Sequence, residues 1–150
     1  MLACSVASAS AGQRDRPFKG QLSGTITFSP GAPTPPFLWV TTNAVGQASH
    51  MGKTVMWSQH AAANDFGGVM TLTAANGDRV DCVYTGVGNL PPDIAIGDWY
   101  VVSSDTTITG GTGRFAHASG HMEGTASLQF MGFDAPVWPG IWSWTGRIKY

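Results

Sequence analysis

The sequence predicts an all-β protein and, within that class, an eight-stranded antiparallel up-and-down β-barrel. Three observations support this prediction. Apolar and polar residues alternate with a period of two from Pro17 almost to the end of the chain, which is the pattern of half-buried strands. The 20 glycines stand between or inside these runs and favour short connections. Closure removes the exposed edges that an open sheet of long strands would leave, so a barrel is preferred to a sandwich.

The first half of the chain contains five expected strands. Residues 20–28 place Leu22 and Ile26 on one face and threonine on the other. Four prolines between residues 30 and 36 exclude a hydrogen-bonded ladder there. Two later strands flank Asn76-Gly77, a dipeptide typical of a type I′ hairpin turn. The five strands cover residues 20–28, 39–47, 53–60, 66–75 and 78–88.

Three further strands, at residues 98–108, 117–130 and 140–150, are expected in the second half. A proline-containing loop at 88–97 leads into the first of them. Gly110-Gly111-Thr112-Gly113 then predicts a tight connection, because glycine adopts positive φ at little cost.

The same alternation predicts which side chains face the barrel interior. An eight-stranded barrel is either filled by side chains or holds one small ligand, and the sequence leaves both open. The residues expected to face inward are Leu22, Ile26, Phe28, Met70, Leu72, Cys82, Tyr84, Tyr100, Val102, Met122, Leu128, Phe130, Trp142, Trp144 and Ile148. The candidate ligand-binding residues are His60, Met56, Met70, Tyr84, Tyr100, Met122, Phe130, Trp142 and Trp144.

Composition narrows the classes of partner. The formal net charge is -1, with 8 basic and 9 acidic residues, so there is no basic face to bind the phosphates of a nucleic acid. Charged residues make up 11% of the chain, against about 25% in typical proteins. Such a surface is covered by small polar residues or is hidden in a homo-oligomer, a dimer or trimer.

The N-terminus differs from the rest of the chain. Residues 1–16 are expected to be a flexible arm or the remnant of a signal peptide, and residues 17–150 to form a single barrel domain. Ala7-Ser8-Ala9 and Ala9-Ser10-Ala11 have the form that signal peptidase accepts, which predicts an exported protein, periplasmic or secreted, and otherwise a cytoplasmic one. No run approaches the roughly 18 apolar residues of a membrane span.

Several short elements, in order, resemble a known family. They are Phe18-Lys19-Gly20, Gly46-x-x-Ser49-His50-x-Gly52, Ala74-Ala75-Asn76-Gly77-Asp78 and Gly110-Gly111-Thr112-Gly113-Arg114-Phe115 with Ala118-Ser119-Gly120 behind it. The set resembles the allene oxide cyclase-like and dirigent-like β-barrel family, as a bacterial member, over residues 17–150.

The resemblance implies a barrel that holds a hydrophobic ligand in its lumen, and plant members that are commonly trimers. It also implies ring closure of a fatty-acid epoxide in the cyclases, with help from a carboxylate, and coupling of phenoxy radicals in dirigent proteins. This chain has no matching carboxylate at an inward position, because Glu123 falls on the outer face of its strand. No catalytic residue of the family is therefore assigned here.

Few polar residues are candidates for chemistry. His50 stands at a strand junction, where it is either a proton-transfer group or a hydrogen-bond donor to the turn. His60 shares an inward face with Met56 and is either a polar group at the cavity mouth or a histidine that is hydrogen-bonded or exposed without a role in binding. His121 and Glu123 lie two residues apart on one strand face, but no third ligand is evident, so no metal is expected. No cofactor is expected either.

The sequence therefore predicts a barrel that binds a small hydrophobic molecule in its lumen. The first alternative is a cyclase or isomerase whose pocket templates the reaction. It needs a polar group in the lumen, and His60, Tyr84 and Tyr100 are its candidates. The second alternative is a secreted structural or interaction barrel.

Overall fold

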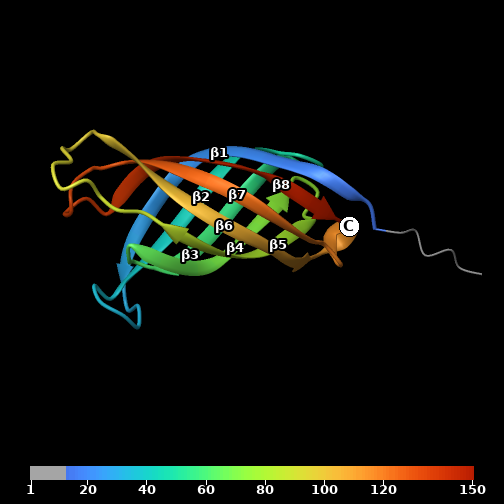
Figure 1. The fold of residues 1–150 in the computed structure, drawn as a ribbon, viewed down its shortest axis with the longest axis horizontal. Helices are drawn as coiled ribbons and strands as arrows, with labels where there is room; N and C mark the ends of the chain where they lie inside the picture. The colour runs from blue at the N-terminus through green and yellow to red at the C-terminus, as the bar shows by residue number, and fades with distance from the viewer. Residues whose placement is uncertain (1–12) are drawn as a thin grey trace, which may run out of the picture.

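The computed structural model describes residues 13–150 and contains one closed antiparallel β-barrel (Figure 1). Strands pair in chain order, and pairing of β1 with β8 completes the ring. The predicted fold class is confirmed. The strands are β1 (Asp15–Pro30), β2 (Leu38–Ala48), β3 (Gly52–Ala61), β4 (Asp65–Ala74), β5 (Arg79–Val87), β6 (Trp99–Gly111), β7 (Ser119–Gln129) and β8 (Val137–Lys149), and a 3₁₀ turn, η1 (Gly113–Phe115), lies between β6 and β7.

Side chains alternate between the lumen and the outside along every strand. Except at an irregularity in the β5–β6 register between Asp81 and Cys82, even-numbered residues lie opposite one another, as Leu22 is opposite both Gly46 and Trp142. Every residue predicted to face inward is buried or half-buried. The inward set was therefore predicted correctly, because a period of two is a property of the strand itself.

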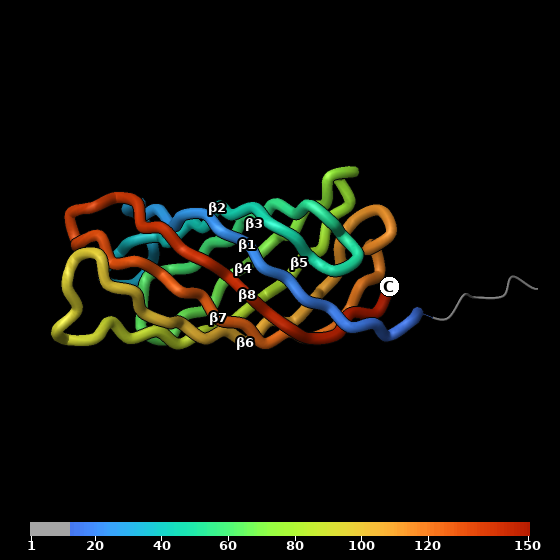
Figure 2. Tube along the Cα trace, turned by 90° about the horizontal axis from the view of Figure 1, so that it is seen from above, coloured from blue at the N-terminus to red at the C-terminus, as the bar shows by residue number. Residues whose placement is uncertain are grey.

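The two ends of the barrel differ. The longer loops, between β1 and β2, β5 and β6, and β7 and β8, lie at one end, on the left in Figures 1 and 2. The short β2–β3 and β4–β5 turns, η1 and the C-terminus lie at the other end. We call these the open end and the closed end.

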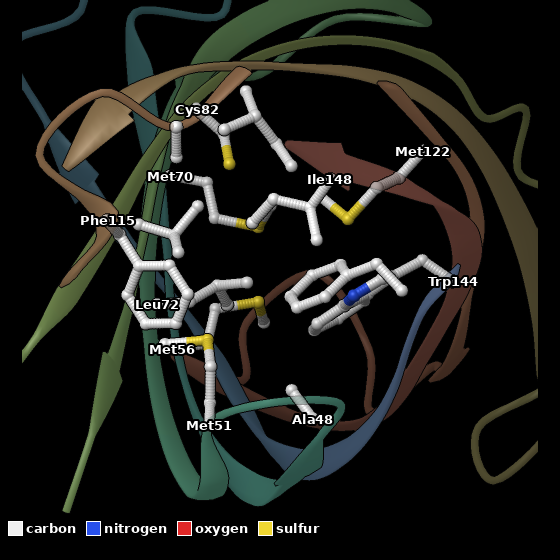
Figure 3. Packing of buried hydrophobic residues seen from close by; sticks show 14 of the residues in the cluster. Ala48, Met51, Met56, Met70, Leu72, Cys82, Phe115, Met122, Trp144 and Ile148 are labelled. Carbon is white, nitrogen blue, oxygen red and sulfur yellow. The ribbon is translucent and has the colours of Figure 1, made fainter. Parts of the chain in front are cut away.

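Tightly packed apolar side chains fill the closed end. Phe18, Phe115, Met122 and Ile148 are all 0% exposed and belong to one cluster. Figure 3 shows the methionine side chains of this cluster meeting in the middle of the barrel. Methionine is unbranched and flexible and fills irregular space of this kind.

Two strands extend beyond their predicted bounds through a proline. β1 begins at Asp15 and includes Pro17, and β8 begins at Val137 and includes Pro139. Each proline pairs on one side only: the β1–β2 register begins at Gly20, and the β7–β8 register does not extend to Pro139. The missing N–H therefore costs no ladder hydrogen bond, which is why these strands tolerate proline.

The β4–β5 hairpin lies where it was predicted, but its turn type was wrong. Gly77 has a φ of 88°, whereas Asn76 is not among the residues with positive φ, which a type I′ turn requires at both central positions. The amide of Gly77 donates to the carbonyl of Ala74, and the amide of Ala74 donates to the carbonyl of Asp78. This is a three-residue loop in which glycine takes the left-handed position.

The β6–β7 connection is longer than the tight turn that was predicted. β7 begins at Ser119 rather than at residue 117, so His117 lies in the connection. η1 turns the chain so that Phe115 enters the closed end and packs edge-on against Tyr150, with ring centroids 4.9 Å apart. The glycines that suggested a hairpin therefore build a cap over one end of the barrel.

Small polar side chains and scattered valines cover the outer wall, where Val45, Val55, Val69 and Val83 are about half exposed. No helix within residues 13–150 has the length and apolar character needed to cross a membrane. The two Ala-Ser-Ala segments lie outside the described residues. Export, the homo-oligomer and the signal remnant therefore remain predictions.

Candidate functional site

A cavity of about 510 Å³ occupies the barrel between the closed-end cluster and the loops of the open end. Its wall is mostly apolar and aromatic, with hydroxyl groups and one histidine set into it. Residues of the β1–β2, β3–β4 and β7–β8 loops border its mouth, among them Pro36, Asn64 and Phe133.

His60 and Tyr84 form the polar centre of this wall. They project inward from β3 and β5, and each lies opposite Gly68 of β4 in the register. The Nδ1 atom of His60 is 2.8 Å from the hydroxyl oxygen of Tyr84. Phe66 stacks on the imidazole, with ring centroids 4.2 Å apart and an interplanar angle of 17°. Gly68 has no side chain, so the two partners meet across β4.

Burial keeps these groups uncharged near neutral pH. It lowers the pKa of His60 from 6.5 to about 4. Burial also raises the pKa of Tyr84 to about 12, although a hydrogen bond with Ser58 lowers that pKa in part. It raises the pKa of Tyr100 to about 12 as well. The phenol of Tyr84 therefore keeps its proton and shares a hydrogen bond with Nδ1 of the neutral imidazole, and the tautomer of His60 sets which of the two groups donates.

Aromatic rings surround the cavity near its open end. Trp138 contacts Phe28, Phe130 and Tyr100 edge-on, with ring centroids 4.8, 5.1 and 6.3 Å apart. Its indole N–H donates to the carbonyl of Gly132, over 3.2 Å. This hydrogen bond ties the β7–β8 loop to the wall, so the rim on this side is held in place.

Trp144 lies where the cavity meets the closed-end cluster. It is 7% exposed, belongs to that cluster and also lines the cavity. Its ring lies over Gly20, where a Cβ atom would stand 2.5 Å from two ring carbons. Figure 3 shows the ring reaching from β8 toward the methionine side chains. The glycine therefore makes the space in which the indole lies.

Seven of the nine candidate ligand-binding residues line the cavity: Met56, His60, Met70, Tyr84, Tyr100, Trp142 and Trp144. Met122 and Phe130 do not. Met122 is enclosed in the closed-end cluster, and Phe130 packs against Trp138 and Phe133 at the open end. Both face inward as predicted, but other side chains fill the space in front of them.

Several lining residues were not among the candidates. Phe66 is the first residue of the expected strand at 66–75, and Trp138 lies two residues before the expected strand at 140–150. Thr42 and Thr106 are 3% and 4% exposed and line the cavity. Both have even numbers, so the alternation that identified Met70 and Tyr84 would have found them if threonine had been read as an inward residue.

His50 has a structural role in the β2–β3 turn. Its φ is 65°, and its Nε2 atom lies 2.9 Å from the carbonyl oxygen of Pro17. This contact joins the turn to β1 at the closed end, away from the cavity. Of the two interpretations of this histidine, the backbone hydrogen bond is the one observed.

The expectation that His121 and Glu123 lack a third partner was wrong. The β6–β7 register places Asp105 opposite Glu123, and the Oδ2 atom of Asp105 is 3.4 Å from Nε2 of His121. The ligand atoms of the three residues lie within 4.8 Å of one another. All three side chains are exposed on the outer wall, as predicted for Glu123, and we assign no metal to them.

Comparison of the chain with models of protein families, with curated proteins and with solved structures finds no match.

Proposed function

We propose that this barrel binds a small hydrophobic molecule in its lumen. The observation that supports the proposal is the cavity of about 510 Å³ with its apolar and aromatic wall. Small-molecule sites are typically concave, mostly apolar spaces of about 300–1,000 Å³ with a few polar groups that orient the ligand. On the order of 15–20 non-hydrogen atoms fit such a volume, if each takes about the 30 Å³ of a liquid water molecule.

A matched pair of valines provides the test. Val102 lines the cavity and is 7% exposed, whereas its neighbour Val101 is 62% exposed on the outer wall. Val102→Phe adds a ring inside the cavity, and Val101→Phe adds the same ring outside. We expect the protein to bind 2-ethylnaphthalene, measured by its fluorescence, with binding abolished by Val102→Phe and unchanged by Val101→Phe.

Thermal unfolding of both variants shows whether each is folded, and native mass spectrometry of the wild-type protein detects a molecule retained through purification. The proposal fails if the folded wild-type protein neither binds the naphthalene nor retains a ligand. It also fails if the two variants bind equally well.

A second candidate function is cyclisation or isomerisation of a substrate held in the same cavity. The hydrogen bond between His60 and Tyr84 favours it, because it aligns an imidazole and a phenol inside an apolar site. Yet a general base works best when its pKa lies near the working pH, and the pKa of His60 is about 4. Binding is therefore the function that we rank first.

Replacement of the polar groups tests the enzymatic alternative. Once a substrate is found, His60→Gln, Tyr84→Phe and Tyr100→Phe are compared with the wild-type protein for turnover. A proton-transfer role predicts a fall of about 100-fold or more in the rate for at least one of them. Unchanged turnover in all three variants would exclude such a role.

A further inference from the structure

One nitrogen of His60 is open to the cavity. The other, Nδ1, lies 2.8 Å from the hydroxyl oxygen of Tyr84, and this is the only hydrogen bond of the imidazole among residues 13–150. Of the buried and half-buried side chains in that range, only Trp144 has an unpartnered nitrogen or oxygen that is fully enclosed. Nε2 of His60 is also unpartnered and therefore keeps accessible surface. Because the side chain faces the lumen and lines the cavity, a molecule in the cavity can reach this atom.

The hydrogen-bonding side chains of the strands are gathered on one side of the cavity. The register places Thr42 opposite Ser58 and Tyr84 opposite Thr106, so these groups are neighbours. β2, β3, β5 and β6 contribute all the inward-facing hydroxyl and imidazole groups that line the cavity: Thr42, Ser58, His60, Tyr84, Tyr100, Ser104 and Thr106.

The other side of the cavity carries aromatic and aliphatic side chains. It is formed by β7, β8 and β1, which are consecutive in the closed barrel. Thr125 and Ser143 of these strands also border the cavity, but their side chains are exposed on the outer wall, with their hydroxyl oxygens 3.3 Å apart. The inward-facing residues on this side are Ile26, Phe28, Ala126, Leu128, Trp138, Trp142 and Trp144.

The charges around the cavity restrict the polar group of a ligand. Among the described residues, the lining includes no lysine or arginine, and its one carboxylate, that of Asp134, is exposed in the β7–β8 loop. Burial lowers the pKa of His60 to about 4, so the imidazole is uncharged near neutral pH. An ion buried without a partner is strongly disfavoured, so the group that meets Nε2 should be uncharged.

The tautomer of His60 decides whether Nε2 donates or accepts a hydrogen bond. A hydroxyl group does both and suits either tautomer, whereas a ketone or an ether suits only one. Given the binding function proposed above, we propose that the ligand is an uncharged alcohol with an apolar ring body. Its hydroxyl bonds to Nε2 of His60, and the ring body lies against β7, β8 and β1.

Three naphthalenes of nearly the same shape test this inference. 2-Naphthalenemethanol has the hydroxyl, 2-ethylnaphthalene has a methyl group in its place, and 2-naphthoate is charged. Their dissociation constants are measured by fluorescence with the full-length wild-type protein and with His60→Phe, which removes Nε2 but keeps a ring. His60→Gln is the rescue variant, because its amide can donate and accept. His121→Phe is the matched control, because His121 is exposed on the outer wall.

We expect His60→Phe to weaken binding of the alcohol about fivefold more than binding of 2-ethylnaphthalene, as for the loss of one hydrogen bond. His60→Gln should bring the ratio of the two affinities back toward the wild-type value, and His121→Phe should leave that ratio unchanged. In the wild-type protein, 2-naphthoate should bind at least about tenfold more weakly than the alcohol at pH 7.

An NMR measurement on the wild-type protein avoids dependence on the folding of a variant. The nitrogen signal of Nε2 of His60 should shift with the alcohol and much less with 2-ethylnaphthalene. If both neutral probes bind but this signal does not distinguish them, the inference is wrong and the binding function stands. Tightest binding of 2-naphthoate also overturns the inference. If no probe binds, the inference is wrong, and the proposed function fails with it when the protein retains no ligand through purification either.

Discussion

At the scale of single residues, His60 makes the stability of the protein depend on pH. Its pKa is about 4 in the folded protein, because of burial, and 6.5 in the unfolded chain. The unfolded state therefore binds the proton more tightly, and acid favours unfolding. The contribution of His60 to stability is complete above pH 6.5 and is lost as the pH falls toward 4.

We expect this loss to be at most about 3 kcal/mol between pH 7 and pH 4. Urea unfolding of the wild-type protein and of His60→Gln at pH 7, 5.5 and 4 measures it. The difference between the two proteins isolates His60, because all other titrating groups are shared. Equal losses of stability in both proteins would contradict the prediction.

The two tyrosines of the cavity should respond differently to loss of the hydroxyl. Tyr84→Phe leaves Nδ1 of His60 without its hydrogen-bond partner, and we expect it to lower the free energy of unfolding by about 1–2 kcal/mol. The hydroxyl of Tyr100 has no hydrogen bond to another described residue, so Tyr100→Phe should change stability by less than about 0.5 kcal/mol. Urea unfolding compares the two variants, and a larger loss for Tyr100→Phe would refute the assignment.

At the scale of the strands, glycines determine where large side chains lie in the lumen. Gly20 in β1 lies under the ring of Trp144, whereas a Cβ atom on Gly67 in β4 would have no neighbour closer than 3.6 Å. Gly68 similarly leaves room for His60 and Tyr84 to meet across β4. The shape of the cavity wall therefore depends on residues without side chains.

Gly20→Ala should displace the indole of Trp144 and lower the free energy of unfolding by about 1–3 kcal/mol. Gly67→Ala is the control and should be neutral or stabilise the protein by about 0.5 kcal/mol, because alanine is less flexible than glycine in the unfolded chain. Thermal unfolding and the NMR signal of the Trp144 indole record the outcome. Similar effects of the two substitutions would show that the close approach at Gly20 does not matter.

At the scale of the whole molecule, the barrel is closed by packing at one end and bordered by loops at the other. Phe115 is 0% exposed at the closed end, and Phe133 is 82% exposed at the open end. Phe115→Ala should therefore cost about 3–5 kcal/mol of stability. Phe133→Ala should cost less than about 0.5 kcal/mol but change the rate of ligand entry.

Urea unfolding and stopped-flow binding of 2-ethylnaphthalene measure these two effects. The assignment of a closed end and an open end would be wrong if Phe115→Ala left the free energy of unfolding unchanged. It would also be wrong if Phe115→Ala changed the rate of ligand entry and Phe133→Ala did not.

A homo-oligomer, one of the two explanations of the low charge, is a separate whole-molecule hypothesis. The half-exposed valines Val45 and Val55 are paired across β2 and β3, as are Val69 and Val83 across β4 and β5. Multi-angle light scattering should give the mass of a dimer or trimer of the 15.7 kDa chain. A monomer at all accessible concentrations would remove this expectation.

The alternation of residue types was sufficient to predict the class of fold, the number of strands and the inward set. A strand turns each side chain to the face opposite its neighbour, so a local pattern reports directly on orientation. Tyr84 and Trp144 were placed correctly for this reason. Turn types were harder to predict, because Asn76-Gly77 is compatible with more than one backbone conformation.

The contacts between side chains on different strands, and the space left between side chains, could not be predicted from the sequence and are seen only in the folded barrel. His60 and Tyr84 are 24 residues apart in the chain and meet because β3, β4 and β5 pair in one register. Asp105 reaches His121 for the same reason. Met122 and Trp144 both face inward, but only Trp144 lines the cavity, because whether an inward side chain meets open space depends on the summed volume of all its neighbours.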